Sequence, residues 1–131
     1  MRKSQLFFNL LFWAIAPVVF GQAGQEPSEF FSKADAFFEN NIKNGKVAYA
    51  DIKDDPAMLD ELIQMAQGIG VSQENVKEYQ AFWINAYNLL VIKGIVDNYP
   101  LKSPIDIDGF FDRKKWEIGG KRITLNGIEN N

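Results

Sequence analysis

The sequence predicts an α+β protein that is mainly α-helical, with a long buried central helix at about residues 73–98 and a small β-hairpin at about residues 116–124. Three observations predict this class. Apolar residues recur at helical spacing over most of the chain. One stretch, 81–96, is apolar on almost every side, as in a helix enclosed by a core. Two glycines, Gly119 and Gly120, separate two short runs of alternating polarity, which is typical of a tight hairpin.

The N-terminus has the layout of a secretory signal peptide. A positively charged start precedes an apolar block from Leu6 to Phe20, and small residues close the block. The block is shorter than the roughly 20 apolar residues that span a membrane. We therefore expect residues 1–21 to be a signal peptide, with cleavage after Gly21 or Ala23. The mature protein is then exported, periplasmic or extracellular, without a stable membrane span; an uncleaved anchor is the alternative.

The first half of the mature chain predicts one helix followed by a short extended segment. Residues 22–27 are expected to be flexible, and a helix is expected at about 28–42. The apolar stripe of this helix consists of Phe30, Phe31, Ala34, Phe37, Phe38 and Ile42. Asn44-Gly45 predicts a turn, and residues 46–50 alternate as in a strand or an extended link.

A second helix is expected to begin at Asp55-Pro56 and to end at Gly68. Asp is a favourable N-cap, and Pro is tolerated at the first helical position because its missing N–H has no partner there. The expected buried face consists of Leu59, Leu62, Ile63 and Ala66. Ser72 is expected to cap the central helix, which ends before Pro100 because a residue preceding proline disfavours the helical conformation.

A last helix is predicted to begin at Asn126. Asn126 and Glu129 have the spacing of a capping box, in which the Glu side chain reaches back to the N–H of the cap residue. Because the sequence stops at Asn131, soon after this helix start, we expect residues 28–131 to be the N-terminal portion of a single domain. A naturally frayed terminus is the alternative.

Composition excludes several function classes. The chain is acidic, with a formal net charge of −3, and the one basic cluster, at 113–115, is flanked by Asp112 and Glu117. Nucleic-acid binding requires a clustered basic face, so we expect no nucleic-acid partner. The sequence has no Cys and no His, which removes thiol nucleophiles, thiolate metal sites and the commonest general base. We expect neither a metal nor a cofactor.

Two groups of polar residues are candidates for a site. Asn85 and Asn88 share one face of the central helix among apolar neighbours, and a buried amide without a partner costs about 1–3 kcal/mol. We interpret them as structural clamps; the alternative is that Asn85, Tyr87 or Asn88 lines a pocket. The carboxylates at Asp106, Asp108, Asp112 and Glu117 do not match a calcium loop, and we interpret them as a solvated loop rather than a metal or glycosidase site.

Several short motifs in the second half carry a family resemblance. They are F-W-I-N-A-Y-N at 82–88, the Tyr99-Pro100 stop, Trp116 followed by a Gly-Gly pair, and L-N-x-I-E at 125–129. In this order and spacing they resemble the bacterial and plant family known as domain of unknown function 547, over about residues 37–130. The resemblance implies no catalytic residue for this chain. The residues of its motifs that match are Trp83, Asn85, Tyr87, Asn88 and Glu129.

The resemblance leaves the molecular function open. It implies that family members continue past the I-E motif into a segment with His and Cys. One hypothesis is therefore a thiol hydrolase or transferase whose catalytic part is missing from these residues. A second is a non-catalytic module of the cell envelope that binds a protein or peptide. A third is a degraded gene product without a function.

Overall fold

The computed structural model describes residues 26–130. The predicted signal peptide, both predicted cleavage sites and most of the predicted flexible segment 22–27 lie outside the described residues. Within the described part of the chain, no helix combines the length and the apolar character that crossing a membrane requires.

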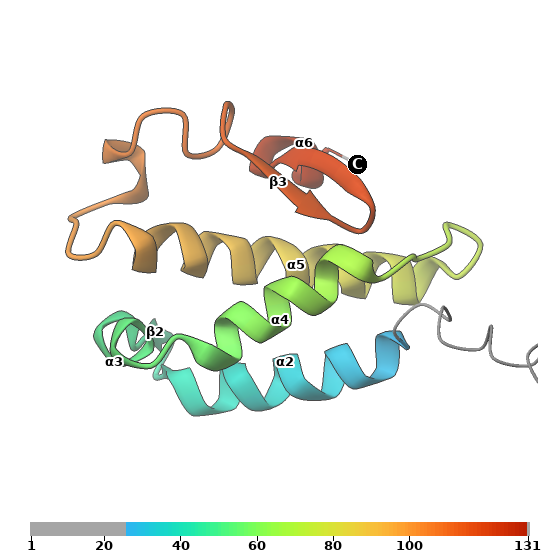
Figure 1. The fold of residues 1–131 in the computed structure, drawn as a ribbon, viewed down its shortest axis with the longest axis horizontal. Coiled ribbons are helices and arrows are strands. Elements are labelled where there is room, and N and C mark those ends of the chain that lie inside the picture. The colour runs from blue at the N-terminus through green and yellow to red at the C-terminus, as the bar shows by residue number, and fades with distance from the viewer. Residues whose placement is uncertain (1–25, 131) are drawn as a thin grey trace, which may run out of the picture.

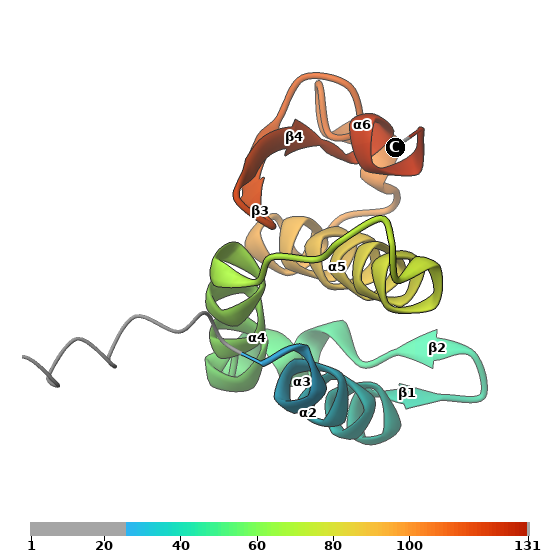
Figure 2. The same ribbon diagram turned by 90° about the vertical axis from the view of Figure 1, so that its right-hand side faces the viewer.

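The described elements follow one another as helices with two small hairpins. In chain order they are α2 (Pro27–Asn41), β1 (Ile42–Lys43), β2 (Lys46–Val47), α3 (Tyr49–Asp54), α4 (Ala57–Gly68), α5 (Val76–Asp97), the 3₁₀ turn η2 (Pro104–Asp106), β3 (Lys115–Ile118), β4 (Lys121–Thr124) and α6 (Leu125–Glu129). Helix α5 lies in the middle (Figure 1). The β3–β4 hairpin and α6 lie on one side of it, and α2 lies on the other (Figure 2). The predicted fold class is confirmed.

Helix α5 supplies the centre of the core. Its buried residues are Phe82, Trp83, Ala86, Leu89, Leu90, Ile92, Gly94, Ile95 and Val96. The helix is not enclosed on every side, however, because Ile84 is 62% exposed. The predicted start at residue 73 is also three residues early. Asn75 is the N-cap, and its side chain accepts a hydrogen bond from the N–H of Glu78, whereas Ser72 belongs to a preceding turn.

The first half of the chain follows the prediction with one omission. Helix α2 lies one residue earlier than expected, with Pro27 in its first turn. Asn44-Gly45 forms the turn between β1 and β2, and both residues have positive φ. The strand predicted at 46–50 is limited to β2, because Tyr49 already begins α3. Helix α3 has no apolar periodicity in the sequence, since Ile52 is its one buried residue.

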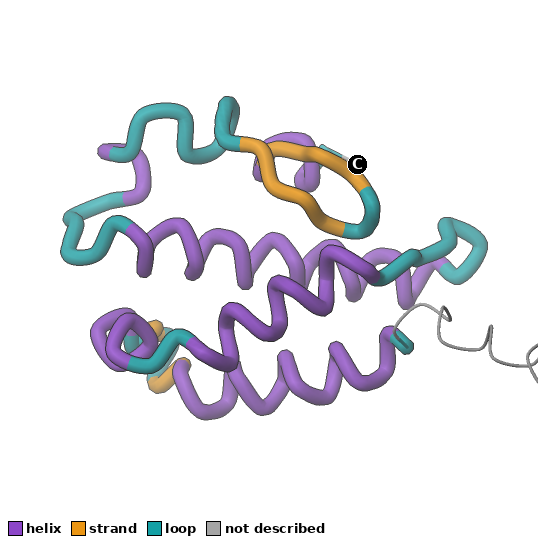
Figure 3. The backbone as a smooth tube through the Cα atoms, viewed as in Figure 1, coloured by secondary structure: helices purple, strands orange, loops and turns teal. Residues whose placement is uncertain are grey.

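The β3–β4 turn completes the C-terminal end of α4. A helix leaves its last carbonyl groups without partners inside the helix. The N–H groups of Gly119 and Gly120 donate to the carbonyls of Ala66 and Gln67, at 2.8 and 3.3 Å. The predicted hairpin is thus confirmed, and its turn lies at the end of α4 (Figure 3). At the other end, α4 begins at Ala57, so the predicted cap residue Asp55 lies one position outside the cap.

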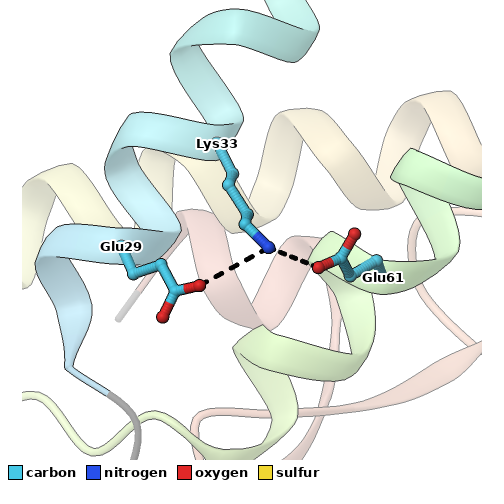
Figure 4. A network of polar contacts seen from close by, with 3 residues as sticks. All are labelled: Glu29, Lys33 and Glu61. Atoms are coloured by element: carbon cyan, nitrogen blue, oxygen red, sulfur yellow. Dashed lines mark hydrogen bonds and ion pairs between the residues drawn. The ribbon is translucent and has the colours of Figure 1, made fainter.

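Two lysines connect the helices at the surface. Lys33 of α2 forms ion pairs with Glu29, at 3.5 Å, and with Glu61 of α4, at 2.5 Å (Figure 4). The hydrogen bond that Lys33 donates to the carboxylate of Glu61 is the main cause that raises the pKa of Lys33. Lys93 of α5 pairs with Asp60 of α4 and with Asp97, each at 2.9 Å. Burial lowers the pKa of Lys93, but the two carboxylates outweigh it, and the pKa is raised.

The two glycines of the β3–β4 turn provide a matched pair for a stability test. Both have positive φ, but a Cβ at Gly119 would lie 3.1–3.2 Å from the rings of Phe82 and Trp83, whereas a Cβ at Gly120 would meet nothing. Gly120→Ala should therefore lose about 1–2 kcal/mol of unfolding free energy for the left-handed backbone alone. Gly119→Ala should lose about 1–3 kcal/mol more, because the core beside it is already packed. Urea unfolding of both variants measures the difference, and equal losses would contradict this packing.

Candidate functional site

A pocket between α5 and α6 brings together four of the five predicted site residues. We name this hollow of about 280 Å³ the α6 pocket. Its lining residues are Trp83, Ile84, Tyr87, Asn88, Ile128 and Glu129. The α5 residues are neighbours because positions three and four apart share a helix face. Trp83, Tyr87, Asn88 and Glu129 were each singled out from the sequence, whereas Ile84 and Ile128 were not.

A second pocket adjoins the first on the other side of the same helix face. This hollow of about 420 Å³, which we name the hairpin pocket, lies between α5 and the segment from the end of α2 to the start of α3. It contains the fifth predicted residue, Asn85. Its lining residues are Phe38, Ile42, Val47, Tyr49, Asn85, Tyr87, Asn88, Val91 and Ile92.

The two pockets share a wall. Tyr87 and Asn88 line both of them, so the pockets adjoin each other along α5. Helix α6 lies above α5 and the β1–β2 hairpin lies below it in the view of Figure 2. We name the whole the α5 groove. Helix α5 forms the wall that the two pockets have in common, at Tyr87 and Asn88.

The prediction that Asn85 and Asn88 are buried clamps is wrong. Asn85 is half-buried, and its amide donates to the carbonyl of Ala81 at 2.8 Å, one turn earlier in the same helix. Asn88 is exposed, and within residues 26–130 its side chain forms no hydrogen bond. The physical reason is that, within residues 26–130, no element packs over the exposed side chain of Asn88. The alternative interpretation, in which these residues line a pocket, agrees with their positions.

The predicted capping box at Asn126 is also wrong. Thr124 caps α6 instead, because its hydroxyl accepts from the N–H of Gly127 at 3.0 Å. The N–H of Asn126 donates to the carbonyl of Phe111, so Glu129 has no free cap N–H to reach. Glu129 is exposed and has no ion pair among the described residues. Its carboxylate is therefore available at the rim of the α6 pocket.

Trp83 anchors the α6 pocket to the core, as the sequence predicted for its aromatic ring. It is 6% exposed and packs edge-on against Phe82, with ring centroids 5.1 Å apart. Lys121 lies 5.6 Å from the ring centroid, within the range of a cation–π contact. The indole N–H of Trp83 is buried without a partner within the described structure. An unsatisfied buried donor costs about 1–3 kcal/mol.

Sequence reasoning missed the apolar lining of the groove. Ile84 carried a usable signal, because it lies four residues before Asn88 and therefore on the same face of α5. Ile128 lies next to the predicted Glu129 and is buried. The lining from α2 and the β1–β2 hairpin, including Phe38 and Ile42, had no signal, since their distance from α5 depends on the tertiary fold.

Of the four carboxylates after α5, Asp106, Asp108 and Asp112 are solvated as the sequence predicted, whereas Glu117 is an exposed residue of strand β3. Arg113 pairs with Asp108 and lies 3.9 Å from Asp112. Glu117 lies 3.9 Å from Arg122, and Asp106 is exposed. Over the described range, no cluster of three or more acidic side chains is arranged to hold a metal ion.

The groove is mainly apolar and has a few polar groups. Its walls are apolar and aromatic, and its polar groups are the amides of Asn85 and Asn88, two tyrosine hydroxyls and the Glu129 carboxylate. Burial raises the pKa of Tyr49, so this hydroxyl is a hydrogen-bonding group rather than a phenolate near neutral pH. Mostly apolar pockets with a few polar groups are typical of ligand sites.

Comparison with known proteins gives one match, in the second half of the chain. Residues 71–131 match the family model described as "Protein of unknown function, DUF547". The match includes all of α5 and α6, and so every residue of the α6 pocket, whereas residues 37–70 of the predicted resemblance lie outside it. Neither a curated protein nor a solved structure matches the chain.

The exposure of Asn88 reverses the stability effect that a buried amide would give. Asn88→Leu should leave the unfolding free energy unchanged or raise it by up to about 0.5 kcal/mol, because no hydrogen bond is lost and Leu favours helix more than Asn does. Leu89→Ala, at the next position and 1% exposed, should lose about 2–5 kcal/mol. Chemical denaturation checks both. A loss above about 1 kcal/mol for Asn88→Leu would show that its amide has a structural partner.

Proposed function

We propose that this protein, whose residues 71–131 match the DUF547 family model, is a non-catalytic module of the cell envelope that binds a peptide segment of a partner protein in the α5 groove. The observation that carries the proposal is the groove itself. Two pockets share Tyr87 and Asn88, and two of their polar side chains, those of Asn88 and Glu129, are exposed.

The apolar surface at the groove supports binding rather than a merely structural role. Ile84 is 62% exposed at the edge of the α6 pocket, beside the half-buried Tyr87. The two volumes, about 280 and 420 Å³, are of the size that binds side chains or small ligands.

The residues of this chain do not favour the thiol-enzyme alternative. The 131 residues contain no Cys and no His, so no side chain of the groove can supply the thiolate or the imidazole of that mechanism. The groove does supply an amide, a carboxylate and aromatic walls. These are recognition groups, and binding is the function that they can perform without further residues.

The location in the envelope is supported by the sequence of residues 1–21. Their positive start, apolar block and small closing residues are the features that the export machinery recognises. A partner for the groove is therefore expected outside the cytoplasm.

The export part of the proposal predicts a defined mature N-terminus. The full chain, expressed in a bacterium with its own first residues, should be recovered outside the cytoplasm starting at Gln22 or Gly24. Intact-mass measurement of the purified protein gives the start directly. A full-length mass that begins at Met1, in the membrane fraction, would identify an anchor instead.

The proposed peptide binding predicts that a charged side chain introduced into the groove weakens the affinity for peptides. The purified protein should enrich specific sequences from a random peptide library, and fluorescence polarisation should give their affinities. Ile84→Asp places a carboxylate on the apolar wall and should weaken these affinities at least about tenfold. Ile105→Asp is the matched control, because Ile105 is 81% exposed and lines neither pocket.

Two results would overturn the binding proposal. One is a library selection in which no sequence is enriched by the folded protein. The other is equal affinity of the wild type and Ile84→Asp for the selected peptides, with Ile105→Asp also unchanged, because the peptides would then bind elsewhere.

A further inference from the structure

We propose that the α5 groove binds its peptide in an extended conformation, with two apolar side chains in the two pockets, the intervening main chain on the Asn88 amide, and a basic side chain at Glu129. This inference rests on the proposed function and specifies the class of peptide. Each of its three parts depends on a different group of the groove.

Each of the two pockets is suited to one apolar side chain of the same extended peptide. They adjoin each other at Tyr87 and Asn88, and both have mainly apolar linings. In an extended peptide each residue advances by about 3.3 Å, and alternate side chains point to the same face. Side chains two residues apart therefore lie roughly 7 Å apart on one face. That spacing suits pockets which meet along a shared wall.

Asn88 lines both pockets, so a peptide that reaches from one pocket to the other passes its side chain. Its carboxamide has one acceptor and two donor hydrogens, so it can pair with both the N–H and the C=O of a peptide. The side chain is exposed and has no hydrogen bond within residues 26–130. Asn85 differs in this respect, because its amide already donates to the carbonyl of Ala81. The groove thus offers one uncommitted amide at the shared wall.

Glu129 places a negative charge at one end of the groove. It is the one charged residue among those that line either pocket, and it lies at the α6 end. Elsewhere in the described chain Glu29 and Glu61 are paired with Lys33, whereas Glu129 has no ion-pair partner there. An unpaired carboxylate beside an apolar pocket attracts a lysine or arginine side chain and repels an acidic one.

Defined peptides test the three parts separately. The probe is acetyl-Ser-Lys-Ser-Leu-Ser-Leu-Ser-Lys-Ser-amide, in which either chain direction places a lysine at Glu129. In a second peptide norleucine replaces both lysines, and in a third the peptide nitrogens between the leucines are methylated. In a fourth peptide alanine replaces both leucines. Fluorescence polarisation with the full-length protein gives each affinity.

The expected results are specific to each group. Norleucine should weaken binding to the wild type about threefold, and more at low salt, because the pair is exposed. Glu129→Gln should remove that difference, whereas Asp35→Asn, an exposed carboxylate on α2, should retain it. N-methylation should weaken binding about five- to tenfold in the wild type and in Asn85→Ala, but not in Asn88→Ala. Alanine for the leucines should abolish binding.

The outcomes separate this inference from the proposed function. If library peptides bind and Ile84→Asp abolishes their binding, but norleucine and N-methylation change nothing in any variant, the extended basic–apolar class is wrong while the peptide-binding function stands. If acidic sequences are enriched instead, the assigned polarity of Glu129 is wrong. If no peptide binds at all, the proposed function itself fails.

Discussion

Helix α5 requires apolar neighbours along most of its length, because nearly half of its side chains are large and hydrophobic. Helices α2, α3 and α4 supply those neighbours, and α6 supplies others from the side opposite α2 (Figure 1). Phe30 of α2 illustrates the contact, with its ring 5.5 Å from that of Phe82. Burial of such rings contributes most of the favourable free energy of a small domain that has no disulfide. The remaining elements are positioned by this requirement, including the two that form the walls of the groove.

The sequence predicted the elements that have a periodic or a turn-forming signal. The stripe from Phe30 to Phe37, the buried face of α4 and the Gly119-Gly120 hairpin are all as expected, because each depends on neighbours within a few positions. Helix α3 was missed because a six-residue helix with one buried side chain has no detectable period. Two of the three wrong caps occur where two suitable residues lie close together, Ser72 with Asn75 and Thr124 with Asn126.

The sequence predicted which residues belong to the candidate site, but not that the side chains of Asn88 and Glu129 would be exposed in a groove. A sequence shows that Asn88 lies among apolar neighbours, and burial was therefore the simplest interpretation. It does not show that α6 and the β1–β2 hairpin leave that face uncovered, since this depends on where two short elements pack. The same limit applies to Glu129, whose role changed when the hydroxyl of Thr124 occupied the position that a capping box would need. In both residues a group expected to stabilise the fold is instead available to a partner.

The hydrogen bonds from the β3–β4 turn to the last turn of α4 have a consequence for folding. They join Gly119 to Ala66 across a long stretch of chain, so the family-matched segment and the helices before it share one set of contacts. Neither segment has a complete hydrophobic core of its own. The two should therefore unfold in a single cooperative transition, and cleavage of the loop between Gly68 and Asn75 should give fragments that remain associated or unfold together. The helices that precede the family match are in this sense part of the same folding unit.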